Sequence, residues 1–279
     1  MENGRKRVVR VFCSAAVRGC CSLRYWWKLA VVMILALFSP YILEMVSEAA
    51  KSLPGQLVEV FRQGGGYNIG ILTVPSLELN TLTRADEIVT GILSGSVTQC
   101  VIAFITTSFI AREFDGGYFN LAMMHGEKRL MIYLKYTGVC AAMSLPAIVV
   151  SPICAGIALS AGYDLKIEDF ASVLMTLGVQ TIMLLAMIIC FMSISVALDG
   201  RGAAIIALCS ILALPMVPNY IRVFTEDKIR LDGLFLVSRL VNSADNIGGH
   251  AAGDLLTAAV TALIFFGLGQ LIFSQKKFD

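Results

Sequence analysis

The distribution of charge along the chain limits what it can fold into more than any other feature. Only 15% of the residues are charged, against about 25% in a typical soluble domain. A helix needs about 20 apolar residues to cross the hydrocarbon core of a bilayer. Five stretches of 20 to 29 residues carry no charged side chain, and they are residues 88–111, 136–163, 170–198, 202–221 and 255–275. They exclude a soluble globular protein, a nucleic-acid-binding domain and a disordered chain.

A shorter uncharged run, Leu29–Leu43, predicts one further span near the N-terminus. The Tyr-Trp-Trp-Lys segment at 25–28 is typical of a membrane interface and lengthens this span to about 19 residues. We expect Pro40 to end or kink the helix. The other spans are expected at about 89–111, 130–159, 171–198, 202–217 and 252–273. The sequence therefore predicts an all-α polytopic membrane protein with six transmembrane helices in a single domain, residues 1–279.

Basic residues decide the orientation of these spans, because they favour the cytoplasmic side of a membrane. An even number of spans places both termini on one side. If that side is the cytoplasm, the inner segments hold 14 of the 22 lysines and arginines and 6 of the 20 acidic residues. Their net charge is +8, and the outer segments carry −6. We therefore expect both termini in the cytoplasm and two long outer loops, at 44–88 and 218–251.

The cytoplasmic segment 1–28 contains a basic amphipathic pattern. Between residues 5 and 24, apolar residues such as Val11 and Phe12 are interspersed with arginines such as Arg10 and Arg18. This composition suits a helix that lies on the inner leaflet. The sequence predicts an elbow helix that braces the first span, and the alternative is a positive tail without fixed structure.

The second outer loop contains a further apolar pattern. Leu234, Phe235, Leu236 and Leu240 predict a helical face within it. Asp254 follows at the start of the last span, where we expect water to reach it. We interpret the two outer loops as a cap over the outer side of a transport pathway, with solvated connectors as the alternative.

The residues of an enzyme or an ion-driven carrier are missing from the sequence. There is no phosphate-binding loop, hydrolase motif or metal-binding motif, the eight cysteines lack metal-ligand spacing, and His125 and His250 are isolated. The polar groups deep in the spans are mainly Gln99 and Gln180, together with serines and threonines. Such groups usually bond between helices, with a place in a substrate path as the alternative. Uphill movement of a substrate would then need energy from a partner.

The loop at 112–129 is the only inner connection long enough to form a helix. Phe114, Tyr118 and Leu121 follow one another at i, i+4 and i+7, which predicts one apolar helical face. Gly126 is expected to end this helix, and Arg129 to mark the return to the membrane. An apolar face at the cytoplasmic surface either rests on the bilayer or fits a groove in a soluble protein.

This loop resembles the first cytoplasmic loop of ABC-2 type permeases, the membrane subunits of one class of ABC transporters. The family pattern is close to EF-x-x-GT-x-R-N, then a small turn, an arginine and I-Y-L-x-K. This chain matches it at Glu113-Phe114, Gly117, Gly126, Arg129 and Ile132-Tyr133-Leu134. It departs from it with Tyr118 for Thr, Asn120 for Arg, and Tyr136 at the usual Lys, with Lys135 one residue earlier.

The resemblance implies a permease subunit of an ABC transporter in the cytoplasmic membrane of a bacterium, most similar to those that export peptides or protect against antimicrobial peptides. Two permease subunits, identical or related, would pair, and each would engage a separate cytosolic ATPase that binds ATP and magnesium. The chain itself would bind no cofactor and catalyse no reaction. Residues 112–129 would form the coupling loop, with contacts from Glu113, Phe114, Gly117, Tyr118, Leu121, Gly126 and Arg129.

Two functions from different classes therefore remain open. The first is a permease that moves a hydrophobic or amphipathic substrate, with a peptide as one candidate. The second is a non-transporting membrane scaffold or sensor subunit that docks a cytosolic protein through the 112–129 loop. Both place the partner at the same loop, and only the first predicts ATP-dependent movement of a substrate.

Overall fold

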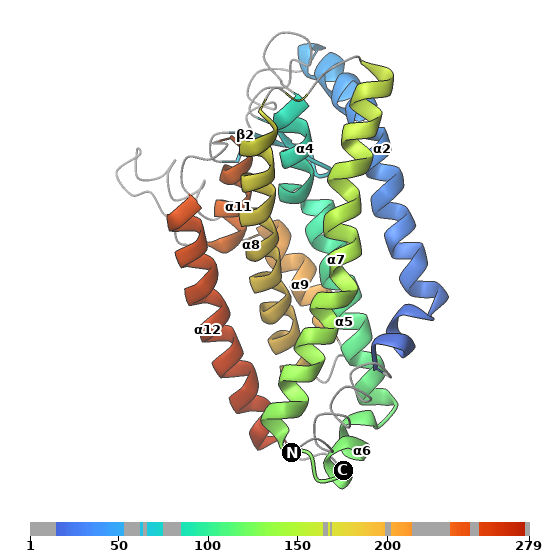
Figure 1. Ribbon diagram of the computed structural model, residues 1–279, viewed down its shortest axis with the longest axis vertical. Helices are drawn as coiled ribbons and strands as arrows, with labels where there is room; N and C mark the ends of the chain where they lie inside the picture. Colours follow the sequence, from blue (N-terminus) through green and yellow to red (C-terminus); the bar gives the residue numbers. More distant parts are fainter. Residues whose placement is uncertain are drawn as a thin grey trace.

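The computed structural model describes residues 15–52, 62–63, 66–74, 85–163, 167, 169–198, 202–213, 235–245 and 251–276. Within these residues the chain is a bundle of long helices with one small antiparallel sheet (Figure 1). In chain order the elements are α2 (Leu23–Ser52), β1 (Arg62–Gln63), β2 (Gly66–Asn68), β3 (Thr73–Val74), α4 (Ala85–Ser94), α5 (Ser96–Asp115), α6 (Tyr118–Met124), α7 (Arg129–Gly162), α8 (Phe170–Ala197), α9 (Ala203–Ala213), α11 (Leu236–Asp245) and α12 (Ala251–Gln275).

Five helical segments are long and apolar enough to cross a bilayer, and they cover Leu23–Lys51, Ala85–Asp115, Arg129–Gly162, Phe170–Ala197 and Ala251–Gln275. Large apolar side chains on their outward faces are exposed, including Trp27 at 70%, Leu174 at 59% and Leu263 at 73%. A surface of this kind requires an apolar surrounding. The prediction of a mainly helical, multi-pass membrane protein is confirmed.

The predicted span at 202–217 is only partly described. Helix α9 covers 11 of these residues, and positions 214–217 lie outside the described residues. A helix of 11 residues rises about 16 Å, which is about half of the hydrocarbon core. Helix α9 alone is therefore too short to be counted as a sixth span.

Pro40 was expected to end or kink the first helix. It does not end it, because α2 continues to Ser52. A proline has no backbone N–H, so it cannot donate to the carbonyl four residues earlier. The Ser39 hydroxyl donates to that carbonyl, Ala36 O, at 2.8 Å. A serine side chain thus replaces the missing bond, as is common in membrane helices.

Helices α4 and α5 form one span that is interrupted at Gly95, whose backbone is extended (φ −62°, ψ 138°). The segment at 69–74, which ends in β3, packs against this interruption, and Val97 N–H donates to Gly70 O at 2.8 Å. A Cβ atom on Gly91 or Gly95 would overlap the carbonyl oxygens of Thr73 and Ile71. The two glycines therefore allow the small sheet to contact the span directly.

The second predicted outer loop contains the expected helix. Helix α11 buries Leu236 and Leu240, and it packs against α4, α8 and α12. Leu234 lies outside the described residues. The prediction that water reaches Asp254 is wrong. The residue is buried, with 7% of its surface exposed, and it accepts a hydrogen bond from Arg239 of α11 at 3.1 Å. An ion pair replaces water because α11 covers the start of α12.

Helix α5 is central in the bundle and contacts α2, α7, α8 and α9. Helix α12 lies at the edge (Figure 1) and packs mainly on α8. Gly269 allows this close packing, because a Cβ there would overlap the Tyr133 and Ser193 hydroxyls. The Ser193 hydroxyl donates to Phe265 O of α12 at 2.7 Å. Helices α7, α8 and α12 are thereby joined in the half of the bundle that leads to α6.

Candidate functional site

The 112–129 loop contains two helical pieces, and not one helix with a continuous apolar face. Helix α5 ends at Asp115, and α6 begins at Tyr118 after a Gly116-Gly117 turn. Gly117 has a left-handed backbone (φ 65°), which glycine adopts without strain. The predicted common face of Phe114, Tyr118 and Leu121 is therefore wrong, because Phe114 belongs to α5 and the other two to α6.

Gly126 ends α6 as predicted. Its φ is 76°, its N–H donates to Met123 O at 2.9 Å, and Glu127 N–H donates to Ala122 O at 3.3 Å. This pair of bonds is the Schellman motif, which closes a helix on a left-handed residue. The chain then re-enters the bundle at Arg129, the first residue of α7, so this boundary is also confirmed.

Glu113 is buried at the end of α5, with 2% of its side chain exposed. It accepts hydrogen bonds from Arg18 Nε and Nη2 at 3.3 and 2.7 Å, and from the Tyr136 hydroxyl at 2.7 Å. Burial, the largest single influence, lowers the pKa of the Arg18 guanidinium, but the hydrogen bond and the charge attraction to Glu113, with smaller contributions from Tyr136 and Tyr118, together leave that pKa raised. The carboxylate thus joins the helical segment at 15–20, α5 and α7.

Arg18 also contacts α6, because its guanidinium lies 4.1 Å from the centre of the Tyr118 ring. A cation above an aromatic face is attracted by the ring. Tyr118 and Tyr136, where the sequence differs from the ABC-2 permease pattern that it resembles, therefore both contact the Arg18–Glu113 pair. Lys135, next to Tyr136, also pairs near α6: its Nζ lies 2.6 Å from Glu127 Oε1, just after that helix.

An aromatic cluster holds α6 against the bundle. Phe119 of α6 is 1% exposed, and its ring centre lies 4.6 Å from that of Phe114, 4.5 Å from that of Tyr136 and 5.4 Å from that of Phe273. Lys276 Nζ lies 4.7 Å from the Phe114 ring. Phe114 therefore packs inside this chain, and Phe119, which the sequence did not single out, is the anchor of α6.

Arg129 joins α7 to the end of α12. Its Nη1 donates to the carbonyl oxygens of Phe273, Ser274 and Lys276, at 3.4 Å to the first and 2.9 Å to the last. A cation suits this position because the final carbonyls of a helix have no intrahelical donors. Lys276 in turn donates to Val196 O near the end of α8, and burial lowers the pKa of its ammonium group.

The outer face of α6 remains apolar and exposed. Leu121 is 51% exposed, Met124 is 83% exposed and Tyr118 is 36% exposed. His125 follows them at the surface, with its Nδ1 2.7 Å from Leu121 O. Helix α6 thus has one face fixed to α5, α7 and α12 and another face open at one end of the bundle (Figure 1). Such an element can transmit a push from outside to several helices at once.

Gln99 and Gln180 are both fully buried in the bundle. Gln99 Nε2 donates to Ser94 O at 2.8 Å, across the interruption between α4 and α5. Gln180 Nε2 donates to the Ser243 hydroxyl of α11 at 3.1 Å. Among the described residues neither Oε1 atom has a partner. Both side chains bond across element boundaries, and each has one acceptor available.

Possible metal ligands in the described part of the chain are its His, Cys, Asp and Glu side chains. There, no group of three or more His, Cys, Asp or Glu side chains could hold a metal ion. Seven cysteines are free thiols, with Cys21 and Cys209 exposed. Cys13 and His250 lie outside the described residues.

No family model matches the sequence, and no curated protein is significantly similar to it.

Proposed function

We propose that the chain is the membrane-spanning subunit of an ABC transporter, located in the cytoplasmic membrane of a bacterium. It moves a hydrophobic or amphipathic substrate, of which a peptide is our candidate, and pairs with a second permease subunit. A separate cytosolic ATPase binds ATP and magnesium and drives the movement. The observation that carries this proposal is α6: a short helix fixed to three long helices on one face, with an exposed apolar face on the other.

The contacts of α6 support a role as the coupling element. Phe119 anchors it to α5, α7 and α12 through ring contacts, and Arg18 and Glu113 connect its base to the 15–20 segment. A partner that displaces α6 must therefore displace these elements too. The apolar face at Leu121 and Met124 has the chemistry of a helix that fits a groove of a soluble protein.

This geometry divides the seven residues expected to contact the ATPase into three groups. We assign the partner contact to Tyr118, Leu121 and Met124, whose side chains are exposed. Glu113, Phe114 and Arg129 act through the packing that fixes α6, since their side chains contact other parts of this chain. Gly117 and Gly126 supply the left-handed turns at the two ends of α6.

Orientation, the six-span count and the elbow helix are part of the proposal. Charge supports it, because the end of the bundle that holds α6 belongs to the segments with a net charge of +8. The segment at 15–20 is helical and separated from α2 by a turn at Cys21, as an elbow requires.

Cysteine labelling tests the orientation. In a variant without the eight native cysteines, Glu48→Cys should react in intact cells with a membrane-impermeant maleimide. Met124→Cys, at the opposite end of the bundle, should react only after the cells are opened. Both positions are exposed. The reverse pattern would refute the orientation and remove the cytosolic ATPase from consideration.

Co-purification tests the docking face. The chain should form a complex with an ABC ATPase encoded beside it. Full burial of each side chain contributes about 1.5–3 kcal/mol, and the partner would cover only the parts still exposed, 51% of Leu121 and 83% of Met124. The double variant Leu121→Asp/Met124→Asp should therefore bind at least about 30-fold more weakly. Leu23→Asp is the matched control: Leu23 is 85% exposed at the start of α2, where an acidic residue is favourable. Undiminished binding by the double variant would contradict the proposal.

ATP hydrolysis separates the permease from the scaffold. The reconstituted complex of a permease should hydrolyse ATP faster when a transported hydrophobic peptide is present, and the double variant should lose this stimulation. A complex that assembles through α6 but moves none of a panel of labelled peptides and lipids would identify a scaffold or sensor subunit.

A further inference from the structure

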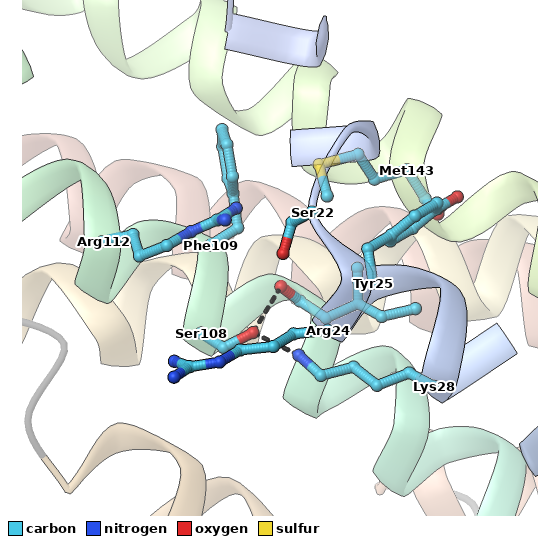
Figure 2. Close-up of a pocket in the computed structure, with 9 residues that line it drawn as sticks. Ser22, Arg24, Tyr25, Lys28, Ser108, Phe109, Arg112 and Met143 are labelled. Carbon is cyan, nitrogen blue, oxygen red and sulfur yellow. Dashed lines mark hydrogen bonds between the residues drawn. The ribbon is translucent and has the colours of Figure 1, made fainter. Parts of the chain in front are cut away.

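A small pocket between the start of α2 and the end of α5 gathers three basic side chains with no acidic one. It is lined by Ser22, Arg24, Tyr25, Lys28, Ile105, Ser108, Phe109, Arg112 and Met143, and its volume is about 60 Å³. Figure 2 shows Arg24 and Lys28 from one side of the pocket and Arg112 from the other, with the Ser22 hydroxyl between them. We propose that this pocket binds the phosphate group of an anionic phospholipid.

Within the described part of the chain, no acidic side chain compensates the positive charge of the pocket. Lys28 Nζ donates to Phe104 O at 2.9 Å and to the Ser108 hydroxyl, and both acceptors are neutral. The guanidinium groups of Arg24 and Arg112 make no hydrogen bond or ion pair to the described residues. The nearby carboxylate of Glu113 is already bonded to Arg18 and Tyr136. Three like charges beside one another at a protein surface repel, and an anion between them removes this repulsion.

The donors fit a phosphate group. Two guanidinium groups offer paired N–H donors, which match phosphate oxygens. Lys28 keeps one N–H beyond its two bonds, and the Ser22 hydroxyl is close by. A volume of about 60 Å³ suits a compact group such as one phosphate.

The position of the pocket favours a lipid over free phosphate. Trp26 and Trp27 stand beside it with 58% and 70% of their surfaces exposed, which is typical of the headgroup level of a membrane. Basic pockets between transmembrane helices at this level bind anionic headgroups. A second, apolar crevice between α2 and α5 is lined by Val32, Leu35 and Val97 among others. It begins about 6–10 Å along α2 from Lys28, so the surface next to the basic pocket is apolar, as contact with the start of an acyl chain requires.

Native mass spectrometry of the purified full chain tests the proposal. After exchange into detergent containing phosphatidylglycerol, the wild type should retain one lipid molecule, and in phosphatidylcholine it should retain none. Arg24→Gln and Arg112→Gln should each weaken retention about fivefold, and together about 30-fold, since each basic group near a membrane surface contributes about 1 kcal/mol. Arg24→Lys and Arg112→Lys should keep most of the binding.

Lys128→Gln is the matched control, because Lys128 is exposed at the same end of the bundle and lies outside the pocket. If it weakens retention as much as the pocket variants, general attraction is responsible and the proposal fails. Equal retention of both lipids would also overturn it. Inorganic phosphate should not raise the thermal stability of the lipid-free protein at concentrations where phosphatidylglycerol does. Protection by phosphate alone would assign the pocket to a free anion and overturn the lipid source.

Discussion

The buried contact of Glu113 with Arg18 and Tyr136 predicts a large and selective loss of stability when the carboxylate is removed. In Glu113→Ala the Tyr136 hydroxyl, 2.7 Å from the carboxylate, loses its acceptor. A buried polar group left without a partner costs about 1–3 kcal/mol. Loss of the ion pair with Arg18 adds only about 1 kcal/mol, because solvent screens the arginine side chain, which is 32% exposed.

The total of about 2–4 kcal/mol should lower the melting temperature by about 4–16 °C, since 1 kcal/mol corresponds to about 2–4 °C in proteins near this size. The assay is thermal unfolding of the purified chain in detergent, followed by size-exclusion chromatography. Glu113→Gln keeps one acceptor oxygen and should fall between the wild type and Glu113→Ala.

Asp115→Asn is the matched control, because it removes the same charge from an exposed position two residues away. It should change stability by less than about 0.5 kcal/mol. In an Arg18→Met background the effect of Glu113→Ala should be smaller, since one of its two partners is already gone. Glu113→Ala and Asp115→Asn variants that melt within 1 °C of each other would refute this account of how the base of α6 is fixed.

Three further substitutions test the packing around the site. Gly126→Ala should destabilise the chain by about 1 kcal/mol, because an alanine at φ 76° is strained; thermal unfolding measures this, and Gly178→Ala, in a helix interior with open space around it, should not be destabilising. Arg129→Gln should increase amide hydrogen exchange in the last turn of α12, whose carbonyls it caps, and unchanged exchange there would contradict the cap. Gly269→Ala should lower the melting temperature by several degrees, because its Cβ would overlap the hydroxyls of Tyr133 and Ser193.

Most of the helical architecture could be predicted from the sequence, because membrane insertion depends on local composition. A helix satisfies its own backbone hydrogen bonds, so about 20 apolar residues are sufficient to specify a span whatever surrounds them. Five spans, the α11 helix and the end of α6 at Gly126 follow from such local patterns. Pro40 shows where local reasoning failed: the Ser39 hydroxyl supplies the bond that the proline removes, and α2 continues.

The candidate site depended on contacts between distant parts of the chain, which no local pattern encodes. The helical spacing of Phe114 and Leu121 predicted a shared face, but a left-handed Gly117 separates them, and Phe114 packs against Phe119. Arg18 lies 95 positions before Glu113. A signal was present in the sequence, because an acidic residue beside a span requires a partner once it is buried, but its burial is a property of the assembled helices.

The sequence by itself determined that this is a mainly helical, multi-pass membrane protein and where five of its long apolar helices lie, and it predicted how charge would divide between the two sides. These properties follow from the free energy of transferring side chains from water to lipid, which depends on the composition of each segment separately. Only the tertiary structure decided which charges are buried in pairs, which are left facing one another between α2 and α5, and which face of α6 is open. These depend on distances between side chains, and they arise only when the helices pack together.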